Sequence, residues 1–141
     1  MTRIDFHSNV GDSIAYACRL ARKAYLSGQP LIVLAEPDRL KRFDEQLWTF
    51  KPLEFVPHCM AGTALAGQTP VLLTASLESL VQDQQHQILL NLSATVPPQF
   101  ARFERLLEVV GNEEHELVAG RERYRFYRDR GYVLNNYKQG D

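Results

Sequence analysis

Residues 27–37 read SGQPLIVLAEP, and this stretch decides the fold class. The apolar run at 31–35 has the length and continuity of a strand that is covered on both faces of a sheet. Gly28 stands where a glycine commonly ends a preceding helix, and Pro37 stands where a proline commonly begins a following one. The stretch therefore predicts a helix, a buried strand and a second helix in direct succession.

The segments on either side of this stretch extend the alternation of strands and helices. We expect a short first strand over 3–7 and a helix over 13–28, whose N-cap is Asp12 or Ser13. A second helix, opened by the proline, covers 37–48, with its large apolar side chains on one side. The order strand, helix, strand, helix is typical of a parallel sheet with right-handed crossovers.

The second half of the chain continues the same architecture. Two further buried-type strands and one short strand are expected, at 71–75, 88–92 and 54–57. Helical spacing of apolar residues predicts helices over 99–111 and 113–130, and the tail that follows is left without an element. No repeat or linker divides the chain. We expect one domain over 1–141, an α/β fold of three layers in which helices flank a mostly parallel sheet.

Composition narrows the class of protein. The chain has 16 Lys and Arg against 17 Asp and Glu, so its net charge of −1 argues against a protein that coats nucleic acid by charge alone. No apolar run approaches the roughly 20 residues of a membrane helix, and the N-terminus does not resemble a signal peptide. The two cysteines, Cys18 and Cys59, lack a CxxC spacing. We therefore expect reduced thiols and a cytoplasmic protein with no membrane contact.

Motifs for catalysis and for cofactors are missing from the sequence. Residues 7–13, HSNVGDS, match no phosphate-binding loop, and the glycines of 61–67 precede a strand rather than a helix. The four histidines are scattered, and the pair His58 and Cys59 provides too few ligands for zinc. We expect no cofactor, no metal and no catalytic residue. A thiol hydrolase would need an exposed cysteine beside a histidine.

The most unusual stretch is RERYRFYRDRGY at 121–132, with five arginines, four aromatic residues and two acids. On a helix, Arg121, Arg125 and Arg128 form one strip, and Tyr124 lies beside it. Guanidinium groups bind carboxylates and phosphates with two hydrogen bonds, and aromatic rings offer stacking surface. Three interpretations follow: a solvated helix, a site for a short acidic peptide with an apolar end, or a single-stranded nucleic-acid surface.

The basic residues outside this helix favour the peptide over the nucleic acid. Single-stranded nucleic acid calls for more rings and for a basic track over several elements. Here the other cations alternate with acids along the chain. Arg102 and Arg105, for example, stand beside Glu104 and Glu108.

Three stretches together resemble the chi subunit family of bacterial DNA polymerase III, an accessory component of the clamp-loader complex. They are SGQPLIVLAEP at 27–37, DEQLWTFKPLEFVPHCMAG at 44–62 and RERYRFYRDRGYVLN at 121–135. The resemblance implies an α/β fold like that of nucleotide-binding proteins but without the phosphate loop, and no enzymatic activity. It also implies two partners, the psi subunit of the clamp loader and the acidic C-terminal tail of single-stranded DNA-binding protein.

The resemblance places the tail site on Arg121, Tyr124 and Arg125, with Val110 of the preceding expected helix as an apolar wall. Arg121 would bind the terminal carboxylate or an aspartate with two hydrogen bonds. Tyr124 would pack against the terminal phenylalanine, and Arg125 would steer the acidic run. The family position one helical turn before Arg121, basic in the best-known member, is Leu117 here.

Arg128, on the same strip, would replace the cation that is missing at Leu117. The resemblance assigns the psi surface to Trp48 and Phe55, and in some members a helicase-like protein competes for it. From residue type alone, burial in the core is the usual fate of both rings. Contact with nucleic acid would then be mainly indirect. The alternative function is a domain that binds single-stranded nucleic acid directly through the Arg/Tyr helix.

Overall fold

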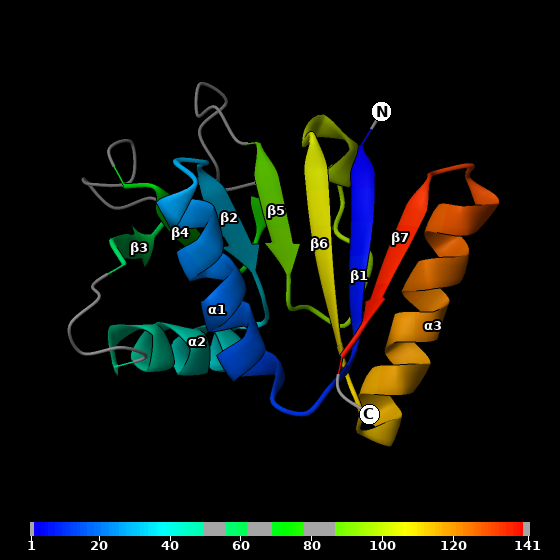
Figure 1. The fold of residues 1–141 in the computed structure, drawn as a ribbon, viewed down its shortest axis with the longest axis horizontal. Coiled ribbons are helices and arrows are strands. Elements are labelled where there is room, and N and C mark those ends of the chain that lie inside the picture. The colour runs from blue at the N-terminus through cyan, green and yellow to red at the C-terminus, as the bar shows by residue number, and fades with distance from the viewer. Residues whose placement is uncertain (1, 50–55, 62–68, 78–86, 140–141) are drawn as a thin grey trace.

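The computed structural model describes residues 2–49, 56–61, 69–77 and 87–139. Over these ranges seven strands form one sheet in the order β3-β4-β2-β5-β6-β1-β7, and each adjacent pair is parallel (Figure 1). The strands are β1 Arg3–Val10, β2 Leu31–Leu34, β3 His58–Met60, β4 Val71–Thr74, β5 Ile88–Asn91, β6 Arg105–Gly111 and β7 Leu134–Lys138. The helices are α1 Ser13–Leu26, α2 Pro37–Thr49 and α3 Glu114–Asp129, with a short 3-10 turn, η3, at Phe100–Arg102. None of these helices is long and apolar enough to cross a membrane.

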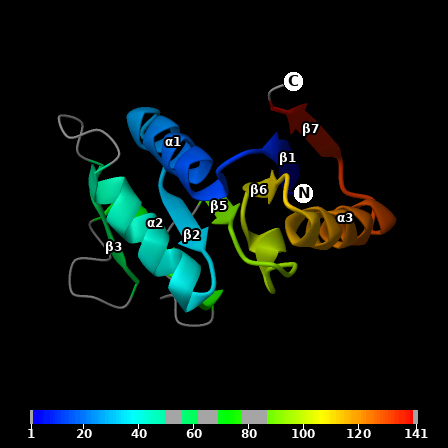
Figure 2. The same ribbon diagram turned by 90° about the horizontal axis from the view of Figure 1, so that it is seen from below.

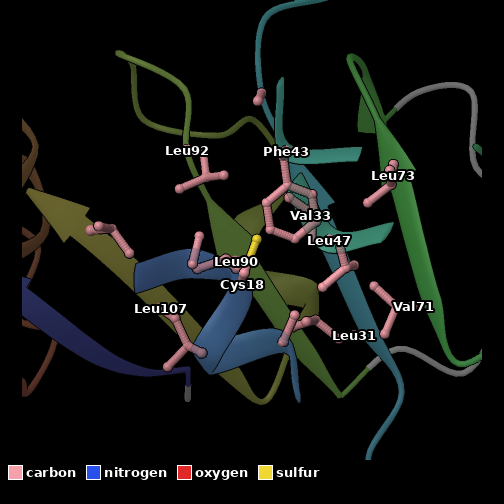
Figure 3. Close-up of a cluster of buried hydrophobic side chains, with 14 of the residues drawn as sticks. Cys18, Leu31, Val33, Phe43, Leu47, Val71, Leu73, Leu90, Leu92 and Leu107 are labelled. Carbon is pink, nitrogen blue, oxygen red and sulfur yellow. The ribbon is translucent and has the colours of Figure 1, made fainter. Parts of the chain in front are cut away.

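The expected three layers are confirmed, because α1 and α3 lie on opposite faces of the sheet (Figure 2). Strand β2 shows how both faces are filled. Leu31 and Val33 belong to the core under α1 and α2, which also contains the thiol of Cys18 (Figure 3). Ile32 and Leu34 belong to the core on the opposite face, the core under α3, which extends from β2 to Tyr127 of that helix. Side chains alternate along a strand, so a run without polar residues is what a sheet buried on both faces requires.

The boundaries of α1 and α3 follow from local chemistry. The Asp12 carboxylate accepts a hydrogen bond from the Ala15 amide at 3.1 Å, and therefore Asp12 rather than Ser13 is the N-cap. Gly28 and Gly131 follow the ends of the two helices with φ of +73° and +84°. A side chain is strained in this left-handed region, whereas glycine is not.

The helix expected over 99–111 is wrong. Only 100–102 form a 3-10 turn, and 105–111 are strand β6, between β5 and β1. Leu106 and Val110 lie in the core under α3. Leu107 and Val109 lie in the opposite core, so the run alternates with the period of a strand. A short apolar run satisfies helical and strand spacing equally, and here burial on both faces selects the strand.

The two edge strands were the least visible in the sequence. Strand β7 pairs in parallel with β1, from Ile4 opposite Leu134 to Ser8 opposite Lys138, where no element was expected. Its sequence, LNNYK, is mostly polar because an edge strand is only half covered. At the other edge, residues 54 and 55 of the expected strand lie outside the described residues, and β3 begins only at His58.

A buried carboxylate joins the three strands at the β7 end of the sheet. Asp5 of β1 is fully buried and accepts hydrogen bonds from Arg105 Nε at 2.8 Å, Arg3 Nε at 3.3 Å and Asn135 Nδ2 at 3.0 Å. Burial acts to raise the pKa of Asp5, but the hydrogen bonds of Asn135 and Arg105 outweigh it and hold the pKa below its ordinary value. The ionised form therefore stabilises the fold.

Replacing Asp5 by Asn tests this junction. We expect the free energy of unfolding to fall by about 1 kcal/mol at neutral pH, because a charge-assisted acceptor is lost while the two arginines stay partly exposed. A lowered pKa stabilises the folded state above the pKa of the unfolded chain, about 4, and that stabilisation is lost as the pH falls through the folded value. Urea unfolding of both proteins from pH 7 to pH 2.5 should show the difference shrinking only below about pH 4. A difference that grows on acidification would contradict the assignment.

Candidate peptide-binding site on α3

Helix α3 turns an unusual face toward the sheet. Its buried residues are Gly120, Arg123 and Tyr127, a glycine, a cation and a phenol rather than aliphatic side chains. Figure 1 shows the helix beside β1 and β7 at one end of the sheet. The residues that hold this face decide which side chains of the helix point to solvent.

The buried partner of this face is Glu108 of β6, which has no exposed surface. It accepts hydrogen bonds from the Tyr127 hydroxyl at 2.6 Å, Arg123 Nε at 2.9 Å and Asn91 Nδ2 at 3.1 Å. Burial raises the pKa of Glu108, while Arg123 and the other two donors act in the opposite direction. Arg123 also donates through Nη1 to the carbonyl of Ala94 at 3.1 Å. The network fixes the rotation of α3 about its axis.

Gly120 allows the helix to approach the sheet closely. A Cβ atom at this position would lie 2.7 Å from Cγ1 and 2.8 Å from Cγ2 of Val110. The sequence predicted Val110 on a preceding helix, as an apolar wall of the tail site. In the structure Val110 is buried and instead packs beneath α3 from strand β6.

The outer face of α3 carries the expected arginine strip. Arg121, Arg125 and Arg128 are exposed. Arg128 lies 3.3 Å from Asp129. The side chains of Arg121 and Arg125 have no hydrogen bond or ion pair with any residue that the structure describes. Two guanidinium groups one helical turn apart are therefore available to an anion.

Apolar surface borders these free guanidinium groups. The Tyr124 ring is half-buried and meets Phe6 of β1 edge to face, with ring centroids 5.2 Å apart. One to two turns earlier, Leu117 packs against the core under α3, and Val118 is 45% exposed. The strip thus combines positive charge with a partly exposed ring that is held in place from behind. Such a surface suits a carboxylate attached to an apolar group.

The other expected contact surface lies at the far end of the molecule. Trp48, near the end of α2, is 52% exposed, and its ring centroid lies 4.5 Å from that of His58 on β3. Phe55 lies outside the described residues. Because β3 and β7 are opposite edges of the sheet, Trp48 and the α3 strip are well separated (Figure 1).

A nucleophilic role for Cys18 conflicts with its surroundings. The thiol is fully buried, and burial raises its pKa to about 12. At neutral pH the side chain is therefore a protonated thiol that packs in the core, as the sequence had indicated. Cys59, on β3, is partly exposed.

One group of potential metal ligands was missed in the sequence. Glu113, His115 and Glu116, at the start of α3, bring their ligand atoms within 4.8 Å of one another. The spacing i, i+2, i+3 was the available signal. However, the Glu116 carboxylate already accepts a hydrogen bond from the Ser13 hydroxyl at 2.8 Å, and Arg39 Nη1 lies 3.8 Å away. A cation at this position would meet the positive charge of Arg39.

Comparison with known proteins points to one family. The family model described as DNA polymerase III chi subunit, HolC, matches residues 1–135. A DNA polymerase III subunit chi of Pseudomonas aeruginosa is 31% identical over 98% of this chain and 97% of its own length. The subunit chi of Haemophilus influenzae is 29% identical over 88% of this chain and 85% of its own length. That of Escherichia coli is 29% identical over 84% of this chain and 80% of its own length.

Proposed function

The chain belongs to the DNA polymerase III chi subunit family, and we propose that it is a non-catalytic bridge between two partners of the polymerase. One partner is the acidic C-terminal tail of single-stranded DNA-binding protein. The other is the psi subunit, which connects the bridge to the clamp loader. The observation that supports this proposal best is the pair of unpaired guanidinium groups beside a ring on α3.

In the proposed complex Arg121 binds a carboxylate of the tail with two parallel hydrogen bonds. Tyr124 packs against the terminal phenylalanine, and because Phe6 supports its ring, little side-chain entropy is lost on binding. Arg125 attracts the acidic run that precedes this phenylalanine. Arg128 adds positive charge but must give up its contact with Asp129 to make a direct bond.

The psi subunit, or a helicase-like competitor, would contact the surface around Trp48 and Phe55. A half-exposed tryptophan that rests on a histidine ring is the kind of residue on which binding energy concentrates. Trp48, beside β3, and the arginine strip of α3 are at opposite ends of the sheet (Figure 1), and this separation leaves room for both partners at once.

Replacing Arg121 by Ala tests the tail site. We expect the wild-type protein to bind a fluorescent acidic peptide ending in Ile-Pro-Phe with a micromolar dissociation constant, about −8 kcal/mol, that weakens with salt. Arg121→Ala should weaken this binding about tenfold, the usual cost of one charge-assisted contact. Arg128→Ala should weaken it less, since Asp129 already offsets that charge. Fluorescence anisotropy gives these constants.

Three controls make the test specific. A peptide of scrambled sequence should bind weakly, and Lys41→Ala, which removes an exposed cation of α2, should bind like the wild type. Peptide binding that is insensitive to both Arg121→Ala and Arg125→Ala would place the site on another surface. The alternative function is direct binding of nucleic acid through α3. It would be supported if a single-stranded oligonucleotide displaced the peptide and if Arg121→Ala abolished binding of that oligonucleotide.

A further inference from the structure

The face of the sheet opposite α3 has no helix in front of β1 or β7 among the described residues (Figure 1). Ile4 and Phe6 of β1 belong to the core under α3. Side chains alternate along a strand, so Asp5 and His7 point to the opposite face. His7 stands opposite Tyr137 of β7 in the register of the sheet. This edge of the sheet therefore presents polar and aromatic side chains where a core face would be apolar.

A row of rings crosses this face from β7 to α1. The Tyr137 ring stacks on His7, with centroids 5.3 Å apart and planes 24° from parallel. His7 in turn meets the Tyr16 ring of α1 at 5.3 Å, and its Nδ1 lies 2.6 Å from the Tyr16 hydroxyl. The Arg19 guanidinium carbon lies over the Tyr16 ring, 5.2 Å from its centroid. Tyr137 begins the row and is 42% exposed, so a further planar group has a place to stack.

Cations surround the row of rings. Arg3 and Arg105 both form ion pairs with the fully buried Asp5. Two partly exposed positive charges therefore face one buried negative charge. Burial lowers the pKa of His7, the nearby Asp5 carboxylate acts to raise it, and Arg105 and Lys23 lie close enough to act in lowering it. Lys23 has no ion pair within the described part of the chain. The face therefore carries net positive charge.

The sequence suggested that acids offset these cations, but the fold separates them. Glu108, three residues from Arg105 in sequence, lies under α3 on the other face and binds Arg123. Arg105 turns to Asp5 instead. The basic residues thus come from β1, α1 and β6, several elements that meet only in the folded chain.

A buried polar atom within the row lacks a partner. His7 is nine-tenths buried, and its Nε2 has no hydrogen bond with a described residue. A buried nitrogen without a partner costs free energy, because its hydration is lost without replacement. When the Tyr16 hydroxyl donates to Nδ1, Nε2 carries the proton and is a donor for an oxygen of a bound ligand.

We propose that this ring-and-cation face, formed by Arg3, His7, Tyr16, Lys23, Arg105 and Tyr137, binds a segment of single-stranded nucleic acid. An unpaired base continues the ring row by stacking on Tyr137, and the flanking phosphates lie against Arg3, Arg105 and Lys23. Stacked rings between cations are the combination by which proteins hold unpaired bases without reading sequence. Carboxylates of a peptide would use the cations alone, and a duplex would keep its bases away from the ring. The proposal is independent of the tail and psi sites.

The test is binding of a fluorescein-labelled oligo(dT) of about 20 nucleotides to the full chain, by anisotropy at about 50 mM salt. Tyr137→Ala should weaken binding about tenfold, the usual loss of one stacked base. Tyr137→Phe keeps the ring and should stay within about twofold of wild type. Lys23→Ala should reduce the slope of log affinity against log salt by about 0.7, the value for one phosphate of a single strand. Lys41→Ala, an exposed cation on α2, is the matched control and should change neither quantity.

Several results would overturn the proposal. They are the absence of saturable oligonucleotide binding, wild-type affinity in both Tyr137→Ala and Lys23→Ala, and binding of a duplex of equal length as tight as that of the single strand. Loss of acidic-peptide rather than oligonucleotide binding in Tyr137→Ala would make this face a peptide site. Oligonucleotide binding that is lost in Arg121→Ala alone would assign it to α3. Lys23 is exposed, so circular dichroism and the urea midpoint should match wild type in Lys23→Ala. In Tyr137→Ala the circular dichroism should match wild type, and the urea midpoint should fall slightly because the ring packs on His7.

Discussion

Replacing Arg123 by Met should lower the free energy of unfolding by about 3–5 kcal/mol at neutral pH. Arg123 is the cation that faces the fully buried Glu108, at 2.9 Å. Methionine fills a similar volume but leaves the carboxylate with only neutral donors, Tyr127 and Asn91. An uncompensated buried charge is among the most destabilising single changes. Urea unfolding, with the m-value compared between variants, measures the loss.

The pH dependence of this variant identifies the cause. Burial raises the pKa of Glu108, and removal of Arg123 removes an influence that opposes burial. A raised folded pKa favours the folded state below the pKa of the unfolded chain, about 4.3, and this advantage is lost as the pH rises through the folded value. The difference in the free energy of unfolding between wild type and Arg123→Met should therefore shrink on acidification from pH 7 toward pH 4. A stability difference that stays constant with pH would show that lost packing, not the buried charge, destabilises the variant.

Two further variants complete this experiment. The double variant Glu108→Leu, Arg123→Met removes both charges and should be markedly more stable than Arg123→Met alone, because an apolar pair of similar volume replaces an ion pair at little cost. Arg125→Met, on the exposed face of the same helix, is the matched control and should change stability by less than about 0.5 kcal/mol. Equal losses in Arg123→Met and Arg125→Met would contradict the buried network.

Replacing Gly120 by Ala should destabilise the protein by about 2 kcal/mol. In an exposed helix the same change stabilises by up to about 1 kcal/mol, since glycine is a poor helix former. Here the new Cβ atom would lie 2.7 Å from Cγ1 of Val110. Val110 is a short branched side chain, buried near the end of β6, and has few ways to move aside. Thermal or urea unfolding measures the sign of the change in the free energy of unfolding. A loss of stability indicates the close approach of α3 to Val110, whereas a gain would indicate that helix propensity dominates.

Val110→Ala is the second substitution of a double-mutant cycle with Gly120→Ala. It removes the two γ carbons that the new Cβ would meet, so Gly120→Ala should cost less in the Val110→Ala background than in wild type. A double-mutant cycle should give a coupling of at least about 1 kcal/mol. Additive effects would contradict the close approach of α3 to β6. Because the position of α3 sets the position of the arginine strip, Gly120→Ala should also weaken binding of the acidic peptide.

Much of the fold could be predicted from the sequence because it depends on local patterns. The run at 31–35, the glycine that follows α1 and the periodicity of α1 and α2 each belong to a few neighbouring residues. The arginine strip of α3 was visible for the same reason, since helical geometry alone brings Arg121 and Arg125 together. The segment 99–111 was predicted as a helix because its spacing fits both structures, and only its place between β5 and β1 makes it a strand.

The sequence by itself determined the alternation of strands and helices, the family and the exposed face of α3. Only the tertiary structure decided which charges are partners: Arg123 with Glu108, and Arg105 with Asp5 rather than with its acidic neighbours in sequence. It also brought His7 against Tyr137, residues at opposite ends of the chain. The physical reason is that strands of a parallel sheet are joined by long crossovers, so adjacent side chains are distant in sequence. Electrostatic pairing and stacking depend on distance in space and on burial, which no local pattern records.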